Sequence, residues 1–131
     1  MTIRLMIVDD SAAIRGVYAR MLEDQAHIKI VGSVGDPKEA IKQIPGISPD
    51  VVTLDVEMPG MTGLEALQEI RKITPNTKVI MLSTLTQRGS KTSIEAERLG
   101  AAALLQKPGL GMNPAEFKRI FCAKLVELVP A

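Results

Sequence analysis

Continuous apolar segments alternate along the chain with segments that carry a helical apolar stripe. The continuous segments are typical of strands buried on both faces of a parallel sheet. They are residues 3–8, 28–34, 51–54, 79–82 and 101–105. After the first of them, apolar residues recur at i, i+3, i+4, i+7 and i+8, which predicts a helix with one buried face. These residues are Ile14, Val17, Tyr18, Met21 and Leu22. Four further helices are predicted at residues 37–44, 63–73, 89–99 and 114–128.

Residues suited to helix ends stand where these helices begin and end. Asp36 is a suitable N-cap with Pro37 at the first helical position, and Asn113 and Pro114 repeat this pattern before the last helix. Gly100 is a suitable residue just past the end of the fourth helix. Five strand–helix units joined by short, right-handed connections predict an α/β fold, in which helices cover both faces of a parallel sheet.

Polar side chains follow four of the five predicted strands. They are Asp9 and Asp10 after the first strand, Asp55 after the third, Ser83 and Thr84 after the fourth, and Lys107 after the fifth. The carboxyl ends of parallel strands meet at one edge of the sheet, and open α/β sheets bind ligands at that edge. We therefore expect these side chains to converge on one site.

Three carboxylates, two hydroxyls and one ammonium group are a set that phosphoryl transfer uses. Carboxylate oxygens suit Mg²⁺, and a lysine offers a compact positive charge to an anion. A carboxylate can also be the nucleophile that becomes an aspartyl phosphate. Each residue alone has a simpler interpretation, as a helix cap, a turn former or a solvated side chain. Their joint placement at four strand ends favours the chemical interpretation.

The composition excludes several other classes of protein. With 131 residues, 46% of them hydrophobic, the chain is long enough for one domain with a core. A net charge of +1 and an aromatic content of 2% argue against binding to nucleic acid. The single cysteine, Cys122, excludes a disulfide framework, and no apolar run approaches the roughly 18 residues of a membrane span. We therefore expect a soluble, cytoplasmic protein that does not bind membranes.

Four motifs in this order resemble the receiver domain of two-component response regulators. They are VDDS (residues 8–11), LDVEMPGMTG (54–63), the Ser83-Thr84 pair and QKP (106–108). The resemblance covers essentially the whole chain and implies a single receiver domain over residues 1–131. It implies a flavodoxin-like (CheY-like) (βα)5 fold, whose doubly wound parallel sheet has the strand order 2-1-3-4-5. A receiver is a signalling domain and not an enzyme, apart from slow self-phosphorylation by small phosphodonors and slow autodephosphorylation.

The resemblance also implies a role for each candidate residue. Asp55 matches the residue that accepts a phosphoryl group from a histidine kinase. Ser83, with Thr84 beside it, matches the switch hydroxyl. Lys107 matches the lysine that contacts the phosphoryl group, and its peptide bond to Pro108 is expected to be cis. The implied cofactor is Mg²⁺, or Mn²⁺ in its place. Its implied site comprises the acidic pair Asp9 and Asp10, with Asp10 and Asp55 as direct ligands, and the backbone carbonyl of Glu57.

A narrower resemblance points to the receiver of the chemotaxis protein-glutamate methylesterase. The matching stretches are IRLMIVDDSAAIR, DVVTLDVEMPGMTGLEAL and MLSTLTQRGS. In that family a linker and a hydrolase domain follow the receiver, but this sequence has no G-x-S-x-G motif and only one histidine, His27, ahead of the second strand. We therefore expect either an excised regulatory domain or a stand-alone regulator. The implied partners are a chemotaxis-type histidine kinase and an effector domain or protein.

Two positions depart from the usual receiver pattern. Many receivers carry an aromatic residue three positions before the conserved lysine, and here that residue is Leu104. The residue before Gly63 is usually acidic, and here it is Thr62, which we expect to cap the third helix. The resemblance implies output through the face formed by the fourth helix, fifth strand and fifth helix. The resemblance is also compatible with a monomer that dimerises when it is phosphorylated.

Three alternative functions remain open. A Mg²⁺-dependent phosphohydrolase with an aspartate nucleophile needs D-x-D after the first strand, but residues 9–11 are Asp-Asp-Ser. A flavodoxin-like cofactor binder needs a phosphate-binding loop where VDDS stands, and that segment is acidic. A pure interaction module would keep the fold without ever being phosphorylated.

Overall fold

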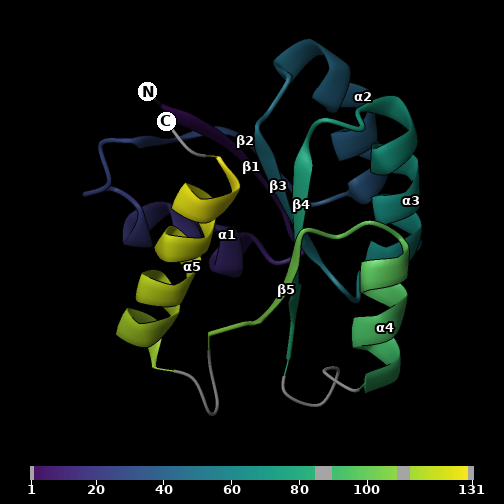
Figure 1. Ribbon diagram of the computed structural model, residues 1–131. Coiled ribbons are helices and arrows are strands. Elements are labelled where there is room, and N and C mark those ends of the chain that lie inside the picture. Colours follow the sequence, from purple (N-terminus) through teal and green to yellow (C-terminus); the bar gives the residue numbers. More distant parts are fainter. Residues whose placement is uncertain (1, 85–89, 109–112, 130–131) are drawn as a thin grey trace.

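The computed structural model describes residues 2–84, 90–108 and 113–129, and it forms a five-stranded sheet between helices (Figure 1). The strands are β1 (Ile3–Val8), β2 (Ile28–Val34), β3 (Val51–Asp55), β4 (Lys78–Ser83) and β5 (Ala103–Gln106). The helices are α1 (Ala12–Met21), α2 (Pro37–Ile47), α3 (Gly63–Ile73), α4 (Ser90–Arg98) and α5 (Pro114–Leu128). The strands lie in the order β2-β1-β3-β4-β5, and every neighbouring pair is parallel. The predicted fold class and strand order are confirmed.

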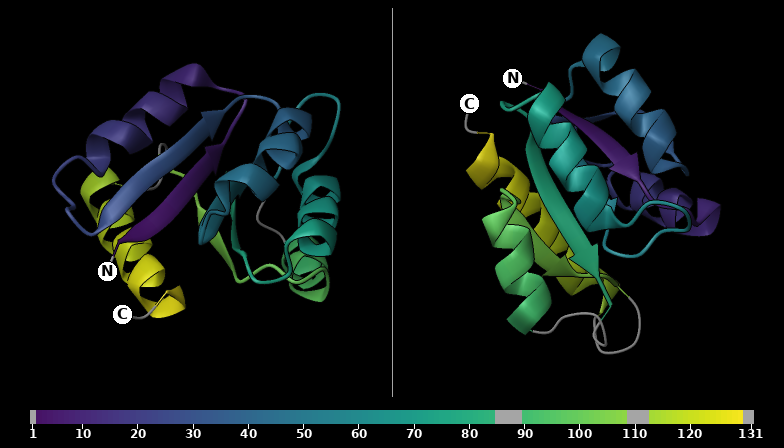
Figure 2. Two further views of the ribbon diagram at one scale, coloured as in Figure 1. Left: turned by 90° about the horizontal axis from the view of Figure 1, so that it is seen from above. Right: turned by 90° about the vertical axis from the view of Figure 1, so that its right-hand side faces the viewer.

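Two layers of helices cover the sheet, as both views in Figure 2 show. Helices α1 and α5 pack on one face, where Tyr18, Phe117 and Phe121 join the odd-numbered residues of β1. Helices α2, α3 and α4 pack on the other face, against Val52 and Leu54 of β3 and against Val79 and Met81 of β4. Successive strand residues point to opposite faces, so a strand covered on both sides must be apolar throughout. This packing explains the continuous apolar segments.

Most element boundaries agree with the apolar pattern, and the differences have local causes. Strands β1 and β2 and helices α3 and α5 have the predicted limits. Helix α2 continues three residues past the predicted end at 44 and includes Pro45, which is exposed in its last turn. Ser48 then ends the helix in the left-handed conformation, with its N–H bonded to the carbonyl of Ile44. Strand β5 begins two residues later than predicted, after a turn in which Gly100 has φ +96°.

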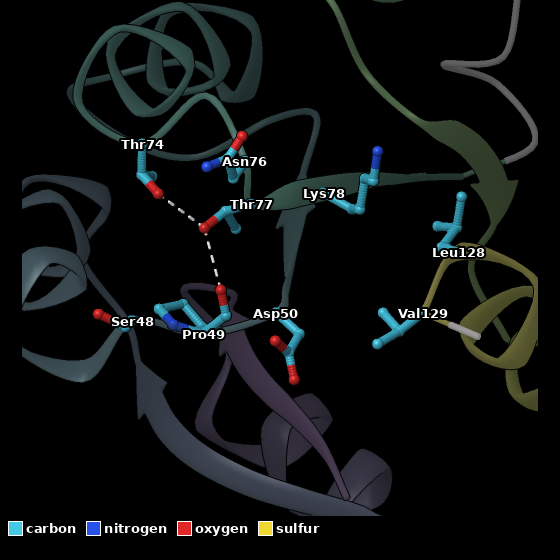
Figure 3. A pocket seen from close by; sticks show the side chains of 9 residues that line it. All are labelled: Ser48, Pro49, Asp50, Thr74, Asn76, Thr77, Lys78, Leu128 and Val129. Atoms are coloured by element: carbon cyan, nitrogen blue, oxygen red, sulfur yellow. Dashed lines mark hydrogen bonds between the residues drawn. The ribbon is translucent and has the colours of Figure 1, made fainter. Parts of the chain in front are cut away.

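The amino edge of the sheet, opposite the candidate site, is closed by polar groups (Figure 3). The buried Thr77 hydroxyl donates to the carbonyl of Pro49 at 3.0 Å and lies 2.8 Å from the Thr74 hydroxyl. The carboxylate of Asp50 accepts the backbone N–H of Arg4 at 2.9 Å. Pro49, Asp50, Thr74 and Thr77 line a pocket of about 390 Å³. Their polar atoms bind the ends of neighbouring strands to one another, so we assign the pocket no chemistry.

The first turn of α3 is held by a reciprocal pair of hydrogen bonds, as expected for Thr62. The Thr62 hydroxyl accepts the N–H of Glu65 at 3.2 Å, and the Glu65 carboxylate accepts the N–H of Thr62 at 3.0 Å. The bond from the backbone N–H of Thr62 to the Glu65 carboxylate is the larger cause of a lowered pKa for Glu65, and the Thr62 side chain lowers that pKa further. A lowered folded-state pKa contributes stability that is present above the ordinary pKa of glutamate and is lost as the pH falls through the lowered one.

We expect Thr62→Ala to lower the free energy of unfolding by about 1 kcal/mol, because an N-cap acceptor is lost. The pKa of Glu65 should rise part of the way toward its ordinary value, because the contribution of the Thr62 side chain is lost while the backbone N–H of residue 62 remains. Urea unfolding and an NMR titration of the Glu65 carboxyl measure the two effects. Thr62→Ser retains the cap and serves as the control. If Thr62→Ala and Thr62→Ser gave the same pKa for Glu65, the capping interaction would be wrong.

Candidate functional site

Strands β1, β3 and β5 carry the candidate site to the carboxyl edge of the sheet. Val8 is the register partner of Leu54. Asp9 and Asp55 are the next residues along these two strands, so they lie side by side. The backbone N–H of Lys107 donates to the carbonyl of Ser83 at 2.8 Å, which holds the end of β5 beside β4. Ile7, Val51 and Leu105 pack on the α1–α5 side of the sheet. The alternation of strand residues places residues 9, 55 and 107 on that same side.

One ammonium group joins two buried carboxylates at this edge. The Nζ atom of Lys107 lies 3.1 Å from Oδ2 of Asp9 and 3.0 Å from Oδ2 of Asp55. The exposed fractions of the three side chains are 13% for Lys107, 2% for Asp9 and 9% for Asp55. A buried charge is tolerated when it is paired and hydrogen-bonded, and here one positive charge serves two negative ones. The site therefore carries excess negative charge.

Backbone and side-chain groups of α1 fix the acidic end of β1. The backbone N–H of Ser11 donates to Oδ1 of Asp9 at 2.9 Å. The guanidinium of Arg15 donates to the backbone carbonyl of Asp9 at 2.7 Å. Gly35 leaves room for that contact, because a Cβ atom there would lie 2.8 Å from Nη1 of Arg15. The sequence pattern did not identify Arg15, because its acceptor is a backbone carbonyl.

The turn after β3 presents Asp55 toward the edge. The N–H of Glu57 donates to Oδ1 of Asp55 at 3.3 Å, and the N–H of Val56 donates to the carbonyl of Leu82 at 2.9 Å. The N–H of Gly63 donates to the carbonyl of Val56 at 2.8 Å. Gly60 adopts φ +83°, a conformation that glycine accepts readily. The turn therefore brings the start of α3 back against the residue that follows Asp55.

The carboxyl group of Asp55 and the ammonium group of Lys107 shift each other's pKa. The pKa of Asp55 is raised, chiefly by burial and further by the neighbouring charge of Asp9, although Lys107 opposes the shift. For Lys107, burial favours the neutral form, but hydrogen bonds and charge from Asp55 and Asp9 outweigh it and raise the pKa. Lys107 is therefore cationic at neutral pH, and the ionised form of Asp55 depends on it.

The donor set beside this ion pair fits a hard divalent cation. Carboxylate oxygens of Asp9, Asp10 and Asp55 all lie within 4.8 Å of one another. Asp9 is buried, whereas Asp10 is exposed and lines a pocket of about 440 Å³ with Glu57 and Met58. Three carboxylates around one ammonium leave negative charge to be neutralised, and an all-oxygen set is what Mg²⁺ prefers. The residues present fit the ion.

The remaining predicted residues lie around this centre. Ser83 is fully buried at the end of β4, and within the described residues its hydroxyl has no hydrogen-bond partner. Thr84 follows it and is exposed. Leu104 is half-buried, pairs with Met81 in the sheet register, and packs on the α2–α4 side, away from Lys107. All peptide bonds of the described residues are trans, so the prediction of a cis Lys107–Pro108 bond is wrong. His27 is exposed.

A parallel sheet of order 2-1-3-4-5 with carboxylates and a lysine at its carboxyl edge defines the class of receiver domains. The family model for the response regulator receiver domain matches residues 5–116, and the chain belongs to this family. The response regulator domain of CheB from Thermotoga maritima superimposes with a TM-score of 0.87 and 37% sequence identity. That superposition covers 98% of this chain and 96% of the other.

Two similar curated relatives are longer proteins named protein-glutamate methylesterase/protein-glutamine glutaminase. The relative from Maricaulis maris is 39% identical over 129 residues, which is 97% of this chain and 32% of the relative. The relative from Paramagnetospirillum magneticum is 48% identical over 107 residues, which is 82% of this chain and 28% of the relative. The chain thus spans about a third of the length of the relatives it matches. None of the helices among the described residues is both long and apolar enough to span a membrane.

Proposed function

We propose that this receiver domain accepts a phosphoryl group from a histidine kinase on Asp55, in a reaction that requires Mg²⁺ or Mn²⁺. The observation that carries the proposal is the buried carboxylate of Asp55, held by Lys107 at 3.0 Å beside Asp9 and Asp10. A structural ion pair would need one carboxylate for one lysine. The additional carboxylates are explained by a site that holds a cation together with a transferred anion.

The chemistry assigned to each residue follows from its contacts. An oxygen of the Asp55 carboxylate forms a bond to phosphorus while the bond from phosphorus to the donor's leaving group breaks. Lys107 neutralises charge on the oxygens of the transferred group. The proposed ligands of the ion are Asp9, Asp10, Asp55 and the backbone carbonyl of Glu57. When bound, the ion supplies positive charge next to the phosphoryl oxygens. The N–H of Glu57 keeps the Asp55 side chain oriented.

The buried hydroxyl of Ser83 suggests how phosphorylation changes the surface. Within the described residues the hydroxyl has no hydrogen-bond partner, so a phosphoryl group on Asp55 would offer it a strong acceptor. Movement of Ser83 would pull on the start of the segment between β4 and α4, and Thr84 would follow. We propose that the α4–β5–α5 face then changes its affinity for an effector. Leu104 leaves this face without the aromatic residue that couples to the hydroxyl in many receivers.

Incorporation of phosphate from acetyl phosphate tests the assignment of Asp55. Wild-type protein should incorporate phosphate when Mg²⁺ is present, and chelation of the metal should prevent it. Asp55→Asn keeps the shape of the side chain but removes the nucleophile, so incorporation should be lost. Equal labelling of both proteins would show that Asp55 is not the acceptor. Asp10→Ala should weaken Mg²⁺ binding, and an unchanged affinity would remove Asp10 from the metal site.

The relatives suggest a place for this domain in chemotaxis. They are named methylesterases and glutaminases, and this chain matches about a third of each. We therefore also propose that a chemotaxis histidine kinase is the phosphodonor, and that the effector is a methylesterase catalytic domain, in the same protein or in another. Sequencing of the gene beyond the codon for residue 131 tests whether the catalytic domain belongs to the same protein. A cytoplasmic location, predicted from the single cysteine, accords with this role.

A further inference from the structure

Helix α1 carries a buried phenol beneath the acidic site. Tyr18 is 2% exposed and lies in the α1–α5 layer. Its ring stacks on Phe117 with centroids 5.8 Å apart, and Phe117 stacks on Phe121 with centroids 5.5 Å apart. These three residues are all the aromatic residues of the sequence, which has one tyrosine, two phenylalanines and no tryptophan. Within the described residues the hydroxyl of Tyr18 is buried and has no hydrogen-bond partner.

The direction of α1 aims this hydroxyl toward the acidic residues. The helix begins at Ala12, just after Asp9 and Asp10, at the carboxyl edge of the sheet. Long side chains in a helix lean toward its N-terminus, so Tyr18 reaches from the second turn back toward that edge. It lies on the face of the sheet that also carries Asp9 and Asp55. Thr53, two residues before Asp55 on the same face, has a second buried hydroxyl without a partner among the described residues.

The electrostatic surroundings keep the phenol in its donor form. The pKa of Tyr18 is raised far above its ordinary value, first by burial and then by the charges of Asp9 and Asp55. The hydroxyl is therefore protonated and can donate. The aromatic stack does not need this hydroxyl, because phenylalanine would fill the same place without burying a polar group. A buried donor next to excess negative charge has a simple electrostatic use, which is to stabilise that charge.

We propose that Tyr18 is a positioning residue of the acidic site, whose buried hydroxyl dipole stabilises the negative charge of Asp9 and Asp55 from the α1–α5 layer without a direct hydrogen bond to either carboxylate. The carboxylates of Asp9 and Asp55 receive hydrogen bonds from Ser11, Lys107 and Glu57. The hydroxyl of Tyr18 would act on the same carboxylates electrostatically, from the α1–α5 layer. Its effect on phosphorylation rests on the function proposed above for Asp55, whereas its response to the charge of Asp55 does not.

The first test uses Tyr18 as its own reporter, because no other residue contributes to the tyrosine absorption or fluorescence of this protein. Asp55→Asn removes one negative charge from the metal-free site and should shift the near-ultraviolet tyrosine bands. The matched control is Asp50→Asn, the same substitution at the opposite edge of the sheet, where the side chain can still accept the N–H of Arg4. A shift in Asp55→Asn alone supports the proposal. No shift, or equal shifts in both variants, would overturn it whether or not Asp55 is phosphorylated.

The second test separates positioning from packing. Tyr18→Phe keeps the ring stack and should leave the free energy of unfolding unchanged or higher, since an unpartnered buried hydroxyl is removed. If the hydroxyl supports the site, the rate of Mg²⁺-dependent labelling by acetyl phosphate should fall about fivefold, which corresponds to a loss of about 1 kcal/mol of transition-state stabilisation. An unchanged rate in a stably folded Tyr18→Phe protein would leave the hydroxyl without a positioning role. Should wild-type protein take no label, the proposed function fails and the spectral test alone decides the role of Tyr18.

Discussion

Gly63→Ala is expected to lower the free energy of unfolding by about 3–5 kcal/mol, an unusually large loss for one methyl group. A Cβ atom at residue 63 would overlap the carbonyl oxygen of Asp55, and it would lie 2.8 Å from Cα and 2.9 Å from the carbonyl oxygen of Val56. All three atoms belong to the backbone that leads out of β3. They cannot move aside as a flexible side chain could, so either the turn or the end of the strand must shift.

The same collision should affect the chemistry of the site. A shifted turn displaces Asp55 relative to Lys107, and the contact of 3.0 Å between their side chains is the one that the proposed function needs. Gly63→Ala protein that still folds should therefore take up phosphate from acetyl phosphate more slowly than wild type. Urea unfolding measures the first effect, and labelling of the folded protein measures the second.

Gly46→Ala is the matched control for this prediction. Gly46 lies in α2, where an added Cβ atom meets no other atom within 4 Å. Alanine is a better helix former than glycine, so this substitution should be neutral or stabilise the protein by about 0.5–1 kcal/mol. If Gly63→Ala unfolded at the same urea concentration as wild type, the close approach between the start of α3 and the end of β3 would be disproved.

The collision at Gly63 illustrates where the sequence stops being informative. The strands and helices were predictable because burial on two faces or on one stripe leaves a periodic pattern, as in β1 and α5. Glycine at 63 could be assigned to a helix start from its neighbours alone. Its contact with the backbone at Asp55 and Val56 depends on how the turn folds back, which no periodicity encodes. The extension of α2 past Pro45 was missed for a related reason, since tolerance of proline depends on exposure in the last turn.

The candidate site, too, has features that the sequence predicts and features that only the folded structure reveals. Parallel strands bring their carboxyl ends together, so the meeting of Asp9, Asp55 and Lys107 followed from topology. The topology does not determine which carboxylates pair with the lysine, because this depends on the burial of Asp9 and the exposure of Asp10. The contact of Arg15 with the carbonyl of Asp9 was not predicted, because a backbone acceptor leaves no trace in the sequence.

Lys107→Met should destabilise the metal-free protein by about 3–5 kcal/mol at neutral pH, the usual cost of removing one partner from a buried ion pair. Methionine fills a similar volume but leaves Asp9 and Asp55 facing each other without a cation. The raised pKa of Lys107 means that its contribution is complete at every pH below the ordinary pKa of lysine, so wild type loses none of it at neutral pH. Thermal unfolding in the presence of a chelator measures the difference.

The pH dependence of this loss has a definite sign. The pKa of Asp55 is already above its ordinary value, and without Lys107 it should rise further. A raised carboxyl pKa favours the folded protein at low pH, and this stability is lost as the pH rises through the folded-state pKa. The deficit of Lys107→Met relative to wild type should therefore shrink under mildly acidic conditions. Added Mg²⁺ should stabilise Lys107→Met more than it stabilises wild type, if the three carboxylates hold the ion.

Asp55→Asn in the Lys107→Met background separates charge repulsion from lost packing. Removing one of the two buried carboxylates should restore much of the lost stability, even though the phosphorylation site is then destroyed. Asp55→Asn alone should be more stable than wild type near neutral pH, because it removes a carboxyl whose pKa is raised mainly by burial. If the double variant were no more stable than Lys107→Met, the loss would come from the packing of the lysine stem. Excess negative charge would then not be the dominant electrostatic feature of this site.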